Sequence, residues 1–88
     1  MEYKYLNGAE LETRADERTL GKEELRSLHE DIGREMSRAM TMLREEDDIN
    51  VRRAITDERY ELKTLAHDVM SRLTGIVRAE MMSRKRSK

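Results

Sequence analysis

Cysteine, proline, phenylalanine and tryptophan are all missing from this chain of 88 residues. Without cysteine there are no disulfides and no thiolate ligands for a metal ion. Without proline, nothing interrupts a long helix from within. Because three tyrosines are the only aromatic residues, a core must consist of leucine, isoleucine, valine, methionine and alanine. Such a core forms a thin seam, which is typical of helical hairpins and bundles.

The chain also has little net charge and no long apolar run. Charged residues make up 42% of it and hydrophobic residues 36%, and the net charge is −1. Overall charge therefore predicts neither a nucleic-acid partner nor a membrane partner. No apolar stretch approaches the roughly 20 residues that a membrane-spanning helix needs. The first residues lack the apolar run of a secretory signal, so we expect a cytoplasmic protein without membrane contact.

The strongest pattern lies in residues 57–82. Apolar residues recur there at steps of three and four, namely Leu62, Leu65, Ala66, Val69, Leu73 and Ile76. This spacing predicts one helix face packed on a core. The start of the helix is open, because Asp47, Asp48 and Asn50 could each cap a helix from about residue 51, and Thr56 could cap one from about residue 57. Since Val51 and Ile55 continue the same stripe, we expect one helix over residues 51–82, followed by a basic tail at 83–88.

A second amphipathic helix is predicted over residues 22–46, and a turn at about 46–50. Gly21 is a permissible N-cap, and Leu20 and Leu25 have the spacing of a hydrophobic staple. The expected core face consists of Leu25, Leu28, Ile32, Met36, Ala39, Met40 and Leu43. Gly33 lies inside this helix at a cost of about 1 kcal/mol relative to alanine. It either permits a close helix crossing or is a tolerated surface glycine.

Residues 1–20 are expected to form an N-terminal arm. Asn7-Gly8 between two short runs favours a β-hairpin, because both residues tolerate a positive φ angle. The alternative is an irregular arm that contains a turn. In the hairpin, Leu6 and Leu11 would anchor the arm on the helices. The polar stretch TRADER, residues 13–18, is expected to be a linker or a single helical turn.

Together these elements predict a single, mainly α-helical domain over residues 1–88, built on an antiparallel two-helix hairpin. A lone hairpin would leave a second stripe of the later helix exposed. That stripe consists of Tyr60, His67, Met70, Thr74, Val77 and Met81. We therefore expect two hairpins to pair through it into a four-helix bundle. The same stripe is equally suited to binding a different protein.

The residues offer no recognisable arrangement for catalysis or metal binding. His29 and His67 are the only histidines, and neither completes the E-x-x-H unit that helical bundles use to hold metals. The chain has no glycine-rich phosphate loop and no nucleophile motif. We expect no enzyme activity, no catalytic or metal-binding residues, no cofactor and no small-molecule substrate.

Two functions fit these patterns. The first is a non-enzymatic protein–protein interaction module, such as an adaptor, an inhibitor or an assembly factor, which acts as a homodimer. The second is a nucleic-acid-binding regulator that uses the basic C-terminal end. The candidate contacts with phosphates, or with an acidic protein, are Arg78, Arg84, Lys85, Arg86 and Lys88.

Overall fold

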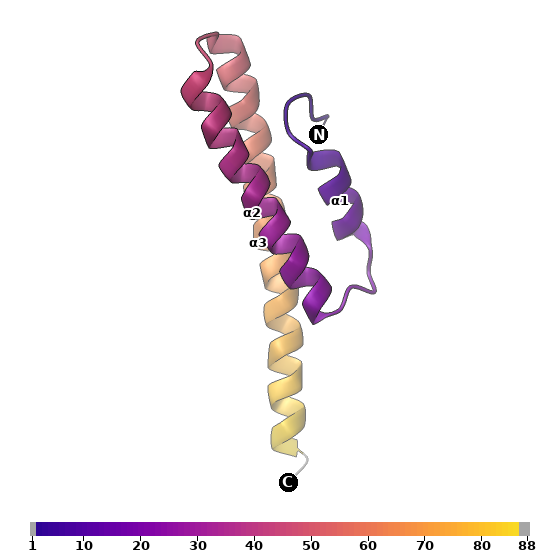
Figure 1. The fold of residues 1–88 in the computed structure, drawn as a ribbon. Helices are drawn as coiled ribbons and strands as arrows, with labels where there is room; N and C mark the ends of the chain where they lie inside the picture. Colours follow the sequence, from indigo (N-terminus) through magenta and orange to yellow (C-terminus); the bar gives the residue numbers. More distant parts are fainter. Residues whose placement is uncertain (1, 87–88) are drawn as a thin grey trace.

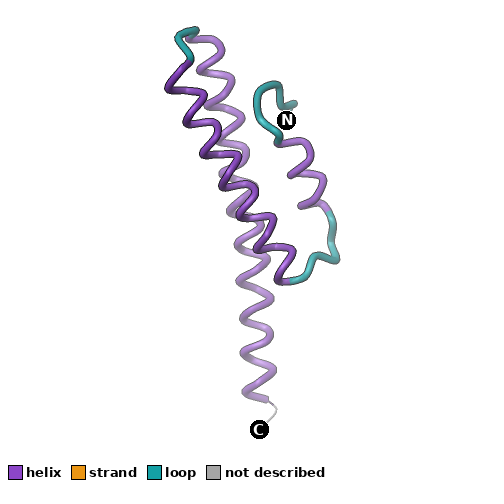
Figure 2. The backbone as a smooth tube through the Cα atoms, viewed as in Figure 1, coloured by secondary structure: helices purple, strands orange, loops and turns teal. Residues whose placement is uncertain are grey.

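The computed structural model describes residues 2–86, which form three helices: α1 (Gly8–Asp16), α2 (Lys22–Glu45) and α3 (Ile49–Arg86). Helices α2 and α3 form an antiparallel hairpin, and the short α1 lies along one side of it (Figure 1). The molecule measures 61 × 21 × 15 Å. The 38 residues of α3 account for the long dimension, because an α-helix rises about 1.5 Å per residue. The last turns of α3 extend beyond the start of α2 (Figure 2). The mainly α-helical fold is thus confirmed.

The loop between α2 and α3 lies where the acidic run predicted a turn. The Asp48 carboxylate caps α3 by accepting two backbone N–H groups of its first turn, at 2.8 and 3.4 Å. The Arg52 guanidinium donates to the backbone carbonyls of Leu43 and Glu46, which would otherwise lack partners at the end of α2. Helix α3 then continues through Thr56 without a break, so the prediction of one continuous helix is confirmed.

The core is a narrow seam between α2 and α3. Its buried residues from the hairpin are Leu25, Leu28, Ile32 and Ala39 of α2, and Ile55, Leu62, Val69 and Leu73 of α3. Met36 and Leu43 are half-buried against it. Met40 was also expected on the core face, but it is 41% exposed. Adjacent residues point about 100° apart around a helix, so burial of Ala39 turns Met40 to the edge of the seam.

The predicted β-hairpin at Asn7-Gly8 is wrong. No strand occurs in residues 2–86, and this dipeptide instead begins helix α1. Asn7 has a φ angle of −84°, and no glycine in the described part of the chain has a positive φ. Leu11 and Ala15, four residues apart, join Leu6 in the buried core. Burial of this helix face outweighs the local turn preference, since most helical stability in proteins comes from tertiary packing.

Other details of the N-terminal region were anticipated. Residues 2–7 form an irregular segment, and the two expected anchors, Leu6 and Leu11, are 5% and 4% exposed. Residues 13–16 of the TRADER stretch are the last turn of α1, and the chain leaves the helix at Glu17. Gly21 precedes α2 as predicted. Gly33 is a surface glycine within the monomer, because a Cβ atom placed there would meet nothing within 4 Å.

A buried carboxylate on α3 holds the strap formed by residues 3–7. Glu58 is 3% exposed, and its Oε1 atom accepts three consecutive backbone N–H groups. The donors are Lys4, Tyr5 and Leu6, at 3.1, 3.0 and 3.0 Å. Because a buried carboxylate must be hydrogen-bonded, the strap and α3 stabilise each other.

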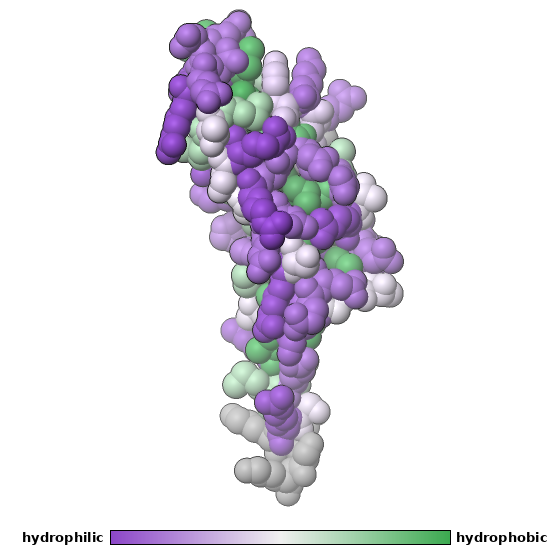
Figure 3. Space-filling view, in the orientation of Figure 1, coloured by the Kyte–Doolittle hydropathy of each residue, from purple (hydrophilic) through white to green (hydrophobic). Residues whose placement is uncertain are grey.

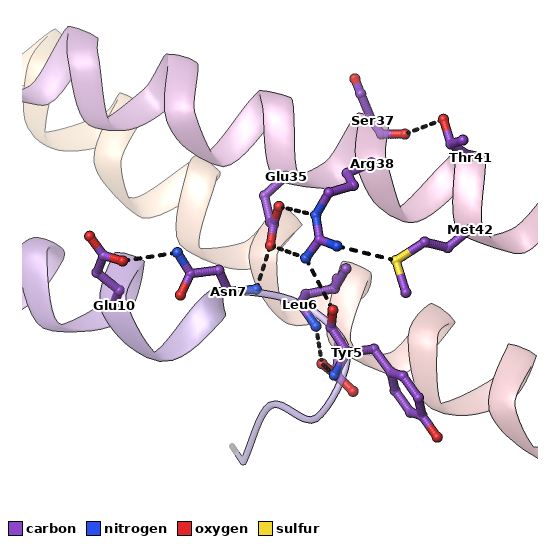
Figure 4. A network of polar contacts seen from close by, with 10 residues as sticks. Tyr5, Leu6, Asn7, Glu10, Glu35, Ser37, Arg38, Thr41 and Met42 are labelled. Carbon is purple, nitrogen blue, oxygen red and sulfur yellow. Dashed lines mark hydrogen bonds and ion pairs between the residues drawn. The ribbon is translucent and has the colours of Figure 1, made fainter.

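A second carboxylate, on α2, holds the end of the strap (Figure 4). Glu35 accepts the backbone N–H of Asn7 and two hydrogen bonds from the Arg38 guanidinium, both at 2.7 Å. Arg38 also donates to the Tyr5 carbonyl at 3.1 Å. Hydrogen bonding from Arg38 lowers the pKa of the Glu35 carboxyl, against the opposing effect of burial. The same bond raises the pKa of Arg38.

The packing of Tyr3 explains why glycine stands at the start of α1. A Cβ atom on Gly8 would overlap the Tyr3 ring. The Tyr3 hydroxyl donates to Glu12 at 2.8 Å. Partial burial, and then this hydrogen bond, raise the pKa of Tyr3 above its ordinary value. The tyrosine therefore folds back over the first turn of α1 and joins the strap to the helix.

Two arginines bond the remainder of α1 to the hairpin. Arg72 of α3 donates to the backbone carbonyls of Ala15 and Glu17, at 2.6 and 3.2 Å. Arg14 of α1 pairs with Asp31 of α2 at 2.8 Å. The strap and α1, held by these polar contacts, cover one of the two grooves that run along the hairpin.

Candidate interaction surface

The second groove of the hairpin, on the side away from α1, is uncovered. The contacts with α1 and the strap use Glu58 and Arg72 on α3. Because residues advance about 100° around a helix, Ala66 and Met70 lie on the other flank of the buried seam. A shallow cavity is found there between α2 and α3, lined by His29, Lys63, Ala66, His67 and Met70. We call this cavity the open groove.

The second stripe predicted from the sequence lies beside the open groove on α3. Tyr60, Met70 and Met81 are 66%, 39% and 57% exposed. His67 and Thr74 are exposed as well. Val77 differs from the other predicted members, because it is half-buried and packs against the core. Five of the six predicted residues thus share one solvent-facing side of α3.

Exposed apolar residues are concentrated on α3. Much of the visible surface in Figure 3 is hydrophilic, with small apolar patches between charged side chains. Six large apolar side chains of the described residues are exposed, and all but Met40 belong to α3. They are Met40, Ile49, Tyr60, Met70, Met81 and Met82.

The charges of α3 are segregated around its axis. At about 100° per residue, all five acids of this helix fall in the half that also carries the α1 contacts: Asp57, Glu58, Glu61, Asp68 and Glu80. The opposite half contains no acid, and we call it the outer face of α3. Its members include Arg53, Arg59, Tyr60, Lys63, His67, Met70, Thr74, Arg78 and Met81. The outer face is therefore basic as well as partly apolar.

The cations of the outer face have no counterions. Within residues 2–86, Arg53, Arg59, Lys63 and Arg78 form no ion pair. The Nε atom of Arg59 is buried and has no hydrogen-bond partner in the described structure. By contrast, Arg72 on the other side is bonded to carbonyl groups at the end of α1. The positive charge of the outer face is thus uncompensated.

The basic C-terminal end lies on the extension of α3. Arg78 and Arg84 are exposed there. Lys85 and Arg86 belong to the last turn of α3, and Lys88 lies outside the described residues. This end continues the outer face, because Arg78 and Met81 belong to both.

In the part of the chain that is described, no group of three or more histidine and acidic side chains could hold a metal ion. None of the helices over residues 2–86 is long and apolar enough to cross a membrane. Comparison of the chain with known protein families, curated proteins and solved structures finds no match. The candidate surface is therefore inferred from the geometry and charge of its residues.

Sequence reasoning found the apolar members of this surface but missed its cations in the middle of α3. Arg59 and Lys63 were not among the predicted contacts. The acids at positions 57, 58, 61 and 68 would have revealed that one side of α3 is basic, because they all fall on the other side once a helix is assumed. His29 could not be placed beside Ala66 in the same way. That neighbourhood depends on the register between α2 and α3, which only the folded hairpin defines.

Proposed function

We propose that this protein is a non-enzymatic helical module for protein–protein interaction, and that the outer face of α3 is its binding surface. The observation that carries the proposal is the exposure of Tyr60, Met70 and Met81 on one side of α3. Aromatic residues and methionine are enriched at protein interfaces, and flexible methionine suits a surface that adapts to a partner. An adaptor, an inhibitor and an assembly factor would all use such a face.

Quantitative affinity capture from the native host tests this function. The wild-type chain would be compared with Met70→Glu and Tyr60→Ala on the outer face, and with Thr13→Glu on the exposed side of α1. All changed residues are exposed, so circular dichroism should be unchanged. We expect one or more proteins to be lost from both outer-face variants and retained by Thr13→Glu. If all four proteins capture the same set in equal amounts, the outer face is not the binding surface.

The homodimer predicted from the sequence stays a proposal. Helix α1 already covers one groove, so two copies would meet through the outer face and the open groove. A two-fold symmetric contact there sets Lys63 and Arg59 of one copy against equally basic residues of the other, and like charges across an interface are unfavourable. We therefore rank the dimer below a partner of a different kind. Sedimentation at micromolar concentration tests it, and a folded monomer at both low and high salt would eliminate it.

Nucleic-acid binding is the second candidate function, and the unpaired cations of the outer face favour it. A protein that neutralises phosphates with these residues should lose affinity steeply as salt increases. Filter binding of generic duplex DNA and single-stranded RNA would measure this dependence. If the basic C-terminal end is the contact, removal of Arg84–Lys88 should weaken binding. Unchanged binding would leave Arg53, Arg59, Lys63 and Arg78 as the candidate contacts.

A further inference from the structure

We propose that the open groove binds an acidic amphipathic helix of another protein. The apolar residues of that helix would be seated on Ala66 and Met70, and its carboxylates would pair with Arg59 and Lys63. This inference rests on the proposed function and names the chemistry of its partner. Three features of the structure support it.

The first feature is the shape and chemistry of the open groove. Two helices supply its walls, with His29 on α2 and Lys63 and His67 on α3. Ala66 and Met70, also on α3, add a small and a flexible apolar contact to the lining. A groove between two antiparallel helices accepts a third helix through residues spaced three and four apart. The apolar part of the groove therefore selects a helical partner with a narrow apolar stripe.

The second feature is the charge around the groove. Lys63 lines it, and Arg59 lies one turn away on the same face of α3, both without a counterion in the described structure. Carboxylates that approach these groups gain charge-assisted hydrogen bonds, whereas a basic helix meets repulsion. A second copy of this chain would present the same cations. The partner that fits is therefore a different, acidic chain.

The third feature is an arrangement already present in the molecule. The other groove of the same hairpin holds α1, whose sequence GAELETRAD contains three acids and one cation. Leu11 and Ala15 seat it in the core, and Arg72 of the hairpin bonds its C-terminal carbonyls. One groove thus binds a short helix through a narrow apolar stripe, an arginine that bonds its C-terminal carbonyls and one ion pair, between Arg14 and Asp31. The hairpin therefore already holds one helix along a groove, and the open groove offers apolar contacts and a cationic side chain to another helix.

Nucleic acid is the competing occupant of a basic surface. Phosphates would satisfy Lys63 and Arg59, but they offer nothing to cover Ala66 and Met70, which also line the groove. An amphipathic helix covers the apolar pair and the cations together. The groove therefore favours the helix, and the experiment includes duplex DNA as a direct competitor.

Fluorescence anisotropy with designed peptides tests the inference on the full chain. Each labelled peptide has about 18 residues, or five helical turns. The first places leucine at steps of three and four, with glutamate at most other positions. A second replaces glutamate by lysine, and a third keeps the acidic composition but scrambles the leucine stripe. We expect only the first peptide to bind well, and its affinity to fall between about 50 and 500 mM salt, because salt screens ion pairs.

Variants then locate the binding site. Lys63→Glu and Met70→Glu should each weaken binding of the acidic peptide by about tenfold or more, corresponding to about 1.4 kcal/mol. Arg18→Glu is the matched control, because Arg18 is an exposed cation outside the groove and without an ion pair among the described residues. It should change the affinity far less. Lys63→Glu should also improve binding of the lysine-rich peptide.

Several results would overturn the proposal. Equal binding of the acidic and scrambled peptides would show attraction by charge without a groove. An equal effect of Arg18→Glu and Lys63→Glu would place the site elsewhere, and stronger binding of duplex DNA than of the acidic peptide would favour nucleic acid. If the peptides fail while a host protein is still captured in a Met70-dependent manner, only the acidic-helix inference fails. If no host protein depends on Met70 or Tyr60, the proposed function itself fails.

Discussion

Replacement of Glu58 by alanine should release the strap and loosen α1 from the hairpin. The carboxylate accepts the N–H groups of Lys4, Tyr5 and Leu6 through a single oxygen. It is 3% exposed, so water does not substitute for it in the folded protein. Alanine leaves all three donors without this acceptor. The hairpin seam itself is untouched, because Glu58 lies on the side of α3 that faces the strap.

The expected loss is worked out from the burial of each donor. The hydrogen bond to Leu6 is buried, and those to Lys4 and Tyr5 are partly buried. An orphaned buried N–H group costs about 1–3 kcal/mol, and a partly solvated one costs less, because water replaces part of the lost bond. We therefore expect the free energy of unfolding to fall by about 3 kcal/mol. That is a large share of the roughly 5–15 kcal/mol typical of a folded domain.

Two measurements check this prediction. Urea unfolding followed by circular dichroism gives the global loss, and amide hydrogen exchange at residues 4–6 reports local release of the strap. Glu58→Gln should be milder than Glu58→Ala, because the amide oxygen still accepts but without charge assistance. Asp57→Ala is the control, since this neighbouring acid is exposed. Unchanged exchange at residues 4–6 together with an unchanged urea midpoint in Glu58→Ala would refute the reasoning.

Three further predictions follow from single features. Gly33→Ala should stabilise α2 by about 1 kcal/mol, because a Cβ atom there meets nothing; a lower melting temperature would contradict this. Gly8→Ala should displace the Tyr3 ring and break its bond to Glu12, at about 1 kcal/mol; unshifted Tyr3 ring resonances in NMR spectra would count against it. Because the pKa of Glu35 is lowered in the folded protein, this carboxylate contributes to stability at pH values above its ordinary pKa of 4.5. That contribution to stability is lost as the pH falls through the folded-state pKa. Hydrogen exchange at residues 4–7 should show this acid-induced opening, and Glu35→Gln should remove its pH dependence.

The hairpin could be predicted because the sequence patterns that specify its helices are local and periodic. Apolar residues at steps of three and four define the seams of α2 and α3, and Leu25, Ile32, Leu62 and Val69 are indeed buried. The turn could be predicted as well, because acids oppose the end of one helix and favour the start of the next. Asp48 fulfils the second role.

The N-terminal region was predicted less well, because its structure depends on distant residues. Asn7-Gly8 has a strong local preference for a tight turn, but the burial of Leu11 and Ala15 against the hairpin decides for a helix. The role of Glu58 is hidden for the same reason. In the sequence it is one of 19 acids, and its three donors lie more than 50 positions away in the chain.

The candidate surface likewise has features that depend on local sequence and features that depend on distant contacts. The spacing of residues along the chain defines the amphipathic stripes of both long helices, the apolar members of the outer face and the absence of acids from that side of α3. These properties depend only on the angle between successive residues of a helix. The tertiary structure alone decided which groove α1 covers, and so which of the two sides is left open. That choice depends on the register of the hairpin and on contacts between residues far apart in sequence, such as Glu58 with Leu6 and Arg72 with Ala15.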